Sequence, residues 1–168
     1  MHKTTNQNFV MKKILIAIAC ICLAVATASA QDFAFKQGYR GNVGLGVGFP
    51  NGGNVGIMAE TTHGYSFGNG LFVGGGVGFQ NYGGDVSLIP LYVDGKFSFL
   101  EGRKVCPFVE LRLGPNFWVG EGSSVTGFYF SPRAGIDFWR LSAALSYDRF
   151  SVDGVGSGVF GISIAFNF

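Results

Sequence analysis

Apolar and polar residues alternate with a period of two along most of the chain after residue 38. The stretch 160–168 shows the pattern most simply, because every second residue from Phe160 to Phe168 is Phe or Ile and the residues between are small or polar. Successive side chains of a β-strand point to opposite faces, so this period predicts strands with one apolar face. No segment after residue 38 has the 3.6-residue period of an amphipathic helix.

Eight such runs follow one another, separated by Gly, Asn, Asp and Pro, which favour turns. The runs are 39–49, 55–67, 71–80, 89–99, 108–119, 128–138, 141–148 and 160–168. Short turns are expected at 68–70, 101–104 and 139–140, and longer loops at 81–85, 120–127 and 151–158. Alternating short and long connections are typical of antiparallel strands that run up and down.

The composition of the polar face distinguishes a soluble sandwich from a membrane barrel. Glycine accounts for 28 residues, all beyond residue 37, and the polar face consists mainly of Gly and Ser with few charges. A soluble sheet would present Lys and Glu to water on that face. Small residues suit the crowded interior of an eight-stranded barrel, whose other face then meets lipid. We therefore predict an all-β fold, an eight-stranded antiparallel up-and-down transmembrane β-barrel.

Charged residues inside the predicted strands share the inward face and nearly balance. Four are basic and five are acidic, namely Arg40, Lys96, Arg112, Arg133, Glu60, Asp94, Glu110, Asp137 and Asp148. An unpaired buried charge is costly, so we expect these side chains to pair and to plug the lumen. The alternative is that they line an ion path. If they form a plug, removal of Arg112 should destabilise the barrel and open a small leak.

The first 30 residues have the three parts of a secretory signal peptide. Lys12 and Lys13 precede an apolar run at 14–25, which is too short to span a bilayer, and Ala28-Ser29-Ala30 offers a cleavage site. Met11 is a possible true start. We therefore divide the chain into a signal peptide at 1–30, a short segment at 31–37 and the barrel domain at 38–168. Beyond the signal peptide nine basic residues face ten acidic ones, which argues against nucleic-acid binding.

The strand that ends in Phe168 resembles the insertion signal of Gram-negative outer-membrane barrels. This signal comprises Phe160, Ile162, Ile164, Phe166 and Phe168. The segments 89–94 (IPLYVD) and 107–114 (PFVELRLG) are similar to those of the small outer-membrane β-barrel domain family, related to the outer-membrane protein A and X barrels. The resemblance implies a cell outer-membrane location, outer-membrane lipid and the barrel-insertion machinery as partners, and a monomer. It leaves the surface ligand open.

Candidate reactive residues do not favour an enzyme. His63 shares its face with Tyr65 and Phe67 and is therefore expected at the lipid interface, away from a nucleophile that a general base must reach. Cys106 is expected to be a small apolar residue beside a turn. We expect no cofactor, no metal and no catalytic activity. The first hypothesis is a structural or surface-interaction role, followed by a narrow diffusion channel, a lipid-modifying enzyme and a soluble lipocalin-like binder.

Overall fold

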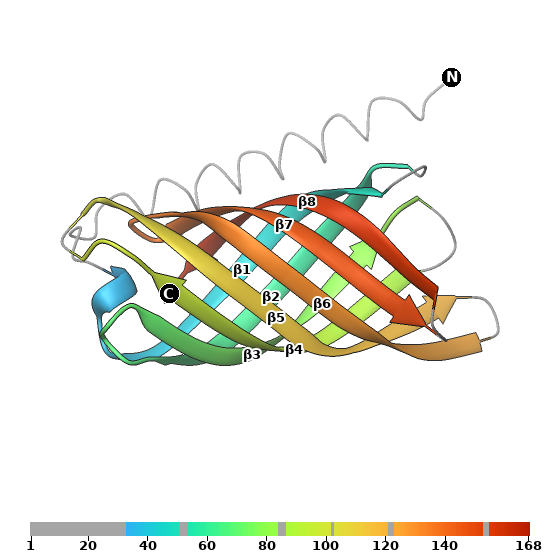
Figure 1. The fold of residues 1–168 in the computed structure, drawn as a ribbon, viewed down its shortest axis with the longest axis horizontal. Helices are drawn as coiled ribbons and strands as arrows, with labels where there is room; N and C mark the ends of the chain where they lie inside the picture. The colour runs from blue at the N-terminus through green and yellow to red at the C-terminus, as the bar shows by residue number, and fades with distance from the viewer. Residues whose placement is uncertain (1–32, 51–53, 84–86, 102, 121–122, 153–154) are drawn as a thin grey trace, which may run out of the picture. The chain divides into compact units, whose positions relative to one another are not determined.

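Eight antiparallel β-strands close into one barrel in the computed structural model of the chain (Figure 1). The structure describes residues 33–50, 54–83, 87–101, 103–120, 123–152 and 155–168. The strands are β1 (Gly38–Pro50), β2 (Gly56–Ser66), β3 (Leu71–Asn81), β4 (Ser87–Ser98), β5 (Val105–Gly120), β6 (Ser123–Phe138), β7 (Leu141–Val152) and β8 (Val155–Asn167). The sequence-based expectation of an eight-stranded antiparallel barrel is confirmed. The proposed signal peptide lies outside the described residues.

The barrel is closed by pairing between its first and last strands. Each strand pairs with its neighbour in sequence, and β8 pairs with β1 over a register that sets Val43 opposite Phe166. Beyond β8, the backbone N–H groups of Phe168 and Gly41 each donate to the carbonyl oxygen of the other at 2.9 Å. No strand edge is left open around the body of the barrel, as a lipid-embedded sheet requires.

The two ends of the barrel differ, and we call the end where β1 begins and β8 finishes the proximal end. A 3-10 turn, η2 (Phe33–Phe35), lies there, with Ala34 buried (Figure 1). The β2–β3 turn at this end has Gly68 and Gly70 at φ values of +80° and +85°, a region that favours glycine. A Cβ at Gly70 would lie 3.0 Å from the Phe35 ring, so this turn and η2 pack closely. No helix in the described part of the chain is long and apolar enough to span a membrane.

At the opposite, distal end, two expected loops are mostly strand. β5 runs to Gly120 and β6 begins at Ser123, while β7 runs to Val152 and β8 begins at Val155. The predicted loops at 120–127 and 151–158 are therefore wrong. Backbone pairing continues through these stretches although their side chains do not alternate, because ladder hydrogen bonds require no apolar face. Among the described residues, β6 pairs with β5 from Ser123 onward, but with β7 only from Phe128 onward.

The alternation of exposure along the strands matches the predicted faces. On β7, for example, Leu145 is 62% exposed while its neighbours Ser146 and Ala144 are buried. The outer wall carries Val, Ile, Leu and aromatic side chains from all eight strands, as a lipid-facing wall does. The buried side chains of the inner face are where a functional site inside the barrel would have to lie.

Candidate functional site

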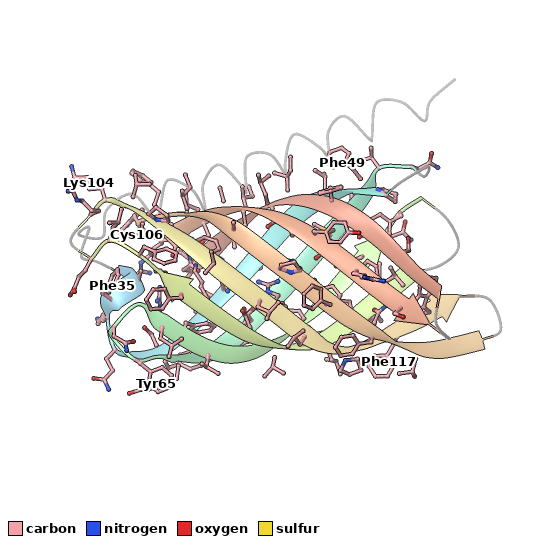
Figure 2. All side chains as sticks on the ribbon, viewed as in Figure 1. Phe35, Phe49, Tyr65, Lys104, Cys106 and Phe117 are labelled. Carbon is pink, nitrogen blue, oxygen red and sulfur yellow. The ribbon has the colours of Figure 1, made fainter. Side chains whose placement is uncertain are left out.

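All nine charged residues predicted to face inward lie on the inner face, and most of them contact an opposite charge. Figure 2 shows the barrel with all described side chains, its proximal end marked by Phe35, Lys104 and Cys106 and its distal end by Phe49 and Phe117. Along the barrel axis the lumen divides into a proximal polar layer, a central ion-pair layer and a distal aromatic layer.

The proximal polar layer is organised around Asp137 on β6. Lys96 of β4 donates to Oδ1 of Asp137 at 2.7 Å, and Ser142 of β7 donates to the same oxygen at 2.6 Å. Ser98 donates to the other carboxylate oxygen at 3.3 Å. Arg40 lies at the proximal rim, where its Nη1 donates to the carbonyl oxygen of Ala34 in η2 at 3.3 Å.

A small cavity lies in this proximal layer. Its volume is about 20 Å³, which holds roughly one water molecule. The lining residues are Arg40, Gly41, Asn42, Phe72, Lys96 and Asn167. The cavity is too small for an organic substrate, so the chemistry that this layer supports is hydrogen bonding and charge pairing.

In the central ion-pair layer, Arg133 and Glu60 make the best-formed contact. The Nη1 and Nη2 atoms of Arg133 donate to Oε1 and Oε2 of Glu60, each at 2.8 Å. Such parallel, charge-assisted hydrogen bonds are among the strongest that side chains form. Arg133 is 5% exposed and lies on β6, whereas Glu60 lies on β2 across the barrel. The pair thus crosses the lumen.

Arg112 on β5 is shared by three carboxylates. Its Nη1 lies 2.7 Å from Oε2 of Glu60, its Nε lies 3.4 Å from Oδ2 of Asp94, and Nε also contacts Glu110. The Nε and Nη1 atoms of Arg112 make these contacts as ion pairs, without hydrogen-bond geometry. The Tyr92 ring covers the guanidinium from one side, 4.6 Å from centroid to Cζ. Arg112 therefore occupies the centre of the lumen with partners on three strands.

Asp148 on β7 is fully buried and is held mainly by hydroxyl groups. Tyr129 donates to its Oδ1 at 3.0 Å, Ser131 donates to the same oxygen, and Ser146 donates to Oδ2 at 3.1 Å. Arg133 is more distant, with Nη2 at 3.9 Å from Oδ1. The balance of charges predicted basic partners for the carboxylates, so these hydroxyl donors are an addition that the structure provides.

A distal aromatic layer that the sequence pattern did not predict lies beyond the ion pairs. Its core is Leu88, Tyr92, Tyr129, Phe150 and Val159, with Tyr82 and Trp118 packed against it. The rings of Tyr129 and Phe150 stack with centroids 5.4 Å apart. Tyr92 and Tyr129 occupy strand positions that point inward by the two-residue alternation, and this alternation was the signal that could have predicted the layer.

Tyr82 follows β3 at the distal end and closes over the same layer. Its hydroxyl donates to Oε1 of Gln80 at 2.7 Å. Burial raises the pKa of the Tyr82 phenol above its ordinary value, so the hydroxyl stays protonated and remains a donor.

His63 and Cys106, the two reactive side chains considered from the sequence, occupy different surfaces. Cys106 is buried on the inner face at the proximal end, where its thiol donates to the carbonyl oxygen of Arg103 at 3.2 Å. His63 lies on the outer wall, as expected, but with the Thr61 hydroxyl 3.1 Å from its Nε2. Thr61 precedes His63 by two residues and shares its face, and its hydroxyl was not among the partners expected from the sequence. Among the described residues, no group of three or more His, Cys, Asp or Glu is arranged to hold a metal ion.

Comparison with known proteins gives matches at the level of structure only. Neither a protein-family model nor a curated protein sequence matches the chain. The outer-membrane enzyme PagL superposes with a TM-score of 0.62 at 16% identity, covering 74% of this chain and 98% of PagL. Neisserial surface protein A gives a TM-score of 0.61 at 16% identity, over 77% and 97% of the two chains. The N-terminal β-barrel domain of Pseudomonas aeruginosa OprF gives a TM-score of 0.55 at 15% identity, covering 79% of this chain and 100% of that domain.

The fold is that of the small eight-stranded outer-membrane β-barrels, in agreement with the resemblance noted in the sequence. The three proteins share the architecture at 15–16% identity, which is a likeness of fold. One of them is an enzyme and another is named as a surface protein, so the fold by itself selects neither activity. The role of this chain must be argued from its own lumen and wall.

Proposed function

We propose that this protein is an integral outer-membrane β-barrel with a structural or surface-interaction role and a closed lumen. The observation that carries the proposal is the central ion-pair layer, in which Arg112 and Arg133 bind carboxylates from several strands while they are almost fully buried. An eight-stranded barrel leaves little room beyond its own side chains, and these side chains join one another across the axis. The distal aromatic layer supports closure at a second level along the barrel axis.

The proposed location rests on the outer wall. Large apolar side chains cover it from end to end, and Tyr39, Tyr65, Phe67, Phe97 and Phe138 form a ring of exposed aromatics at the proximal end. Such belts lie at the membrane–water interface of outer-membrane barrels. Membrane lipid is then the direct partner of the wall, and the β8 strand is the segment that the insertion machinery would recognise. We propose a monomer without catalytic activity.

The test combines gel mobility with conductance. Membrane-extracted protein should migrate at two positions, one when unboiled and another after boiling, because a closed barrel resists the detergent until it is heated. The unboiled form, inserted in planar lipid bilayers, should pass little or no single-channel current. A single gel position together with recovery from the soluble periplasm would contradict the membrane barrel. A stable, ion-selective current from the unmutated protein would contradict the closed lumen and favour a narrow diffusion channel.

A further inference from the structure

His63 has hydrogen-bond partners on both ring nitrogens although it lies on the outer wall. Its Nδ1 is 2.6 Å from the hydroxyl of Tyr39 on β1, and its Nε2 is 3.1 Å from the hydroxyl of Thr61 on β2. The Thr61 hydroxyl also lies 3.0 Å from the main-chain carbonyl oxygen of Asn42, to which it can donate. The three side chains Tyr39, His63 and Thr61 thus form one continuous hydrogen-bonded chain, which we call the outer-wall relay.

A glycine leaves one side of the outer-wall relay uncovered. His63 is paired with Gly41 on one neighbouring strand and with Gly75 on the other. A Cβ at Gly75 would meet only one atom within 4 Å, so this side of the His63 ring is open. On the other side a Cβ at Gly41 would lie 2.7 Å from the Phe168 ring and 3.0 Å from Nδ1 of His63, and the Phe168 ring packs edge-on against His63 with centroids 5.9 Å apart. Tyr39, at the outer end of the relay, is 66% exposed.

The relay can hold its three protons in two arrangements, because a neutral imidazole carries one N–H and accepts at its other nitrogen. In the closed arrangement Tyr39 donates to Nδ1, Nε2–H donates to Thr61, and Thr61 donates to the Asn42 carbonyl. In the open arrangement Thr61 donates to Nε2, and Nδ1–H donates to the Tyr39 oxygen. The Tyr39 hydroxyl proton is then available to an acceptor outside the protein.

The position of the relay indicates what that acceptor is. Tyr39 and His63 lie at the proximal end, where Tyr65 and Phe67 pack edge to face on the same wall with ring centroids 5.4 Å apart. Aromatic belts mark the level of lipid headgroups, where phosphate oxygens are strong acceptors. The outward-facing residues described on β1 and β2 are uncharged, so they do not repel an anion.

We propose that the outer-wall relay is a hydrogen-bond donor site for the phosphate group of a membrane lipid. This inference rests on the proposed membrane location. When lipid phosphate is present, the Tyr39 hydroxyl binds a phosphate oxygen and His63 takes the Nδ1–H form. When no acceptor is present, the relay closes on the Asn42 carbonyl and His63 takes the Nε2–H form. The change of tautomer breaks the Nε2–H bond of His63 and forms its Nδ1–H bond by proton exchange with water, while the Tyr39 and Thr61 hydroxyls rotate and keep their protons. The lipid is bound by hydrogen bonds alone.

The test uses the full chain with ¹⁵N-labelled histidine. His2 and His63 are its only histidines, so a His2→Gln background gives signals from His63 alone. Solid-state NMR of protein in phosphatidylglycerol vesicles should show the Nδ1–H tautomer, with ³¹P dephasing of the ring nitrogens. The same protein in alkyl maltoside micelles, which lack phosphate, should show the Nε2–H tautomer. Tyr39→Phe should abolish the lipid-dependent tautomer and the dephasing, whereas Tyr65→Phe, the matched control on the same wall, should retain both.

Four results would overturn the proposal. One is the same tautomer in vesicles and in maltoside micelles, and another is undiminished dephasing in Tyr39→Phe. Equal dephasing in maltoside micelles supplied with inorganic phosphate would assign the site to free phosphate. The fourth is release of fatty acid from the vesicles by the unmutated protein but not by Thr61→Val, which would show that Thr61 acts as a nucleophile. Vesicle flotation separates these failures from failure of the proposed function: a chain that does not float with lipid contradicts the membrane location, while one that floats without a tautomer change contradicts only this inference.

Discussion

Arg133 and Glu60 tie together opposite sides of the barrel through two hydrogen bonds of 2.8 Å each. They are 73 residues apart in sequence and lie on β6 and β2. The planar guanidinium and the carboxylate match in shape, so the pair fixes the orientation of both side chains as well as their separation. A cross-lumen contact of this kind holds the barrel cross-section at one size.

Replacement of Arg133 by methionine should therefore destabilise the barrel strongly. Methionine has a similar length but no charge, and it would leave Glu60 and Asp148 buried without the guanidinium. Removal of one partner from a buried ion pair costs about 3–5 kcal/mol. The free energy of unfolding, followed by gel mobility of unboiled protein across a urea series, should fall by that amount. The free energy of unfolding should fall less in Arg133→Lys, because lysine keeps the charge but loses the two-point contact.

The matched control is Arg149→Met on β7. Arg149 faces outward and is exposed, so its replacement should change the free energy of unfolding by less than about 0.5 kcal/mol. Equal losses in Arg133→Met and Arg149→Met would mean that the cross-lumen pair contributes nothing specific.

The proposed closure of the lumen by two layers in series changes what is expected of Arg112. The sequence alone suggested that its removal would open a leak, but the distal aromatic layer lies on the same path through the lumen. Arg112→Ala should therefore destabilise the barrel and still pass no current in planar bilayers. The double variant Arg112→Ala with Phe150→Ala should conduct, because both layers are then interrupted. Current from Arg112→Ala alone would show that the aromatic layer does not seal the lumen.

The sequence predicted the faces of the strands because side-chain direction in a strand depends only on parity. Glu110 and Arg112 are two residues apart, and both point inward as expected. The choice of partner could not be derived in this way. Lys96 contacts Asp137 two strands away, and Glu60 contacts Arg133 across the lumen. These contacts depend on the stagger of the closed barrel and on side-chain length, neither of which a strand pattern contains.

The aromatic layer was missed for a related reason. The seventh predicted run ended at Asp148 and the next expected loop began at Ser151, which left Phe150 assigned to neither, whereas β7 continues to Val152. Tyr82 fell in a loop, and Trp118 was not given an inward role. Strand ends depend on backbone pairing with the neighbouring hairpin, so the side-chain pattern indicates them poorly.

Close approach of two strand backbones makes Gly114 a sensitive position. A Cβ at Gly114 would lie 2.0 Å from the carbonyl oxygen of Leu91, so β4 or β5 would have to shift. Gly114→Ala should lower the free energy of unfolding by more than about 1 kcal/mol. At Gly95, on the neighbouring strand β4, an added Cβ meets nothing within 4 Å, and Gly95→Ala should be neutral or slightly stabilising. Both free energies of unfolding can be measured in urea series. Equal values for Gly114→Ala and Gly95→Ala would contradict this account.

Phe168 joins the closing seam of the barrel to its proposed insertion signal. Its backbone pairs with Gly41 in both directions, and its ring packs edge-on against His63 with centroids 5.9 Å apart. Phe168→Ala leaves the backbone pairs in place but removes the ring. We expect a modest loss of stability after refolding into vesicles, and a larger loss of folded protein from the outer-membrane fraction of cells, with more periplasmic degradation.

The difference between these two measurements separates recognition from stability. Phe138→Ala is the control, since Phe138 is a lipid-facing phenylalanine at the same end, 52% exposed. It removes the same ring from the wall without touching β8, so refolding into vesicles should suffer as much as in Phe168→Ala while the yield in cells stays near that of the wild type. If both variants reach the outer membrane equally well, Phe168 is an interfacial side chain like Phe138, and the insertion machinery must recognise another part of β8.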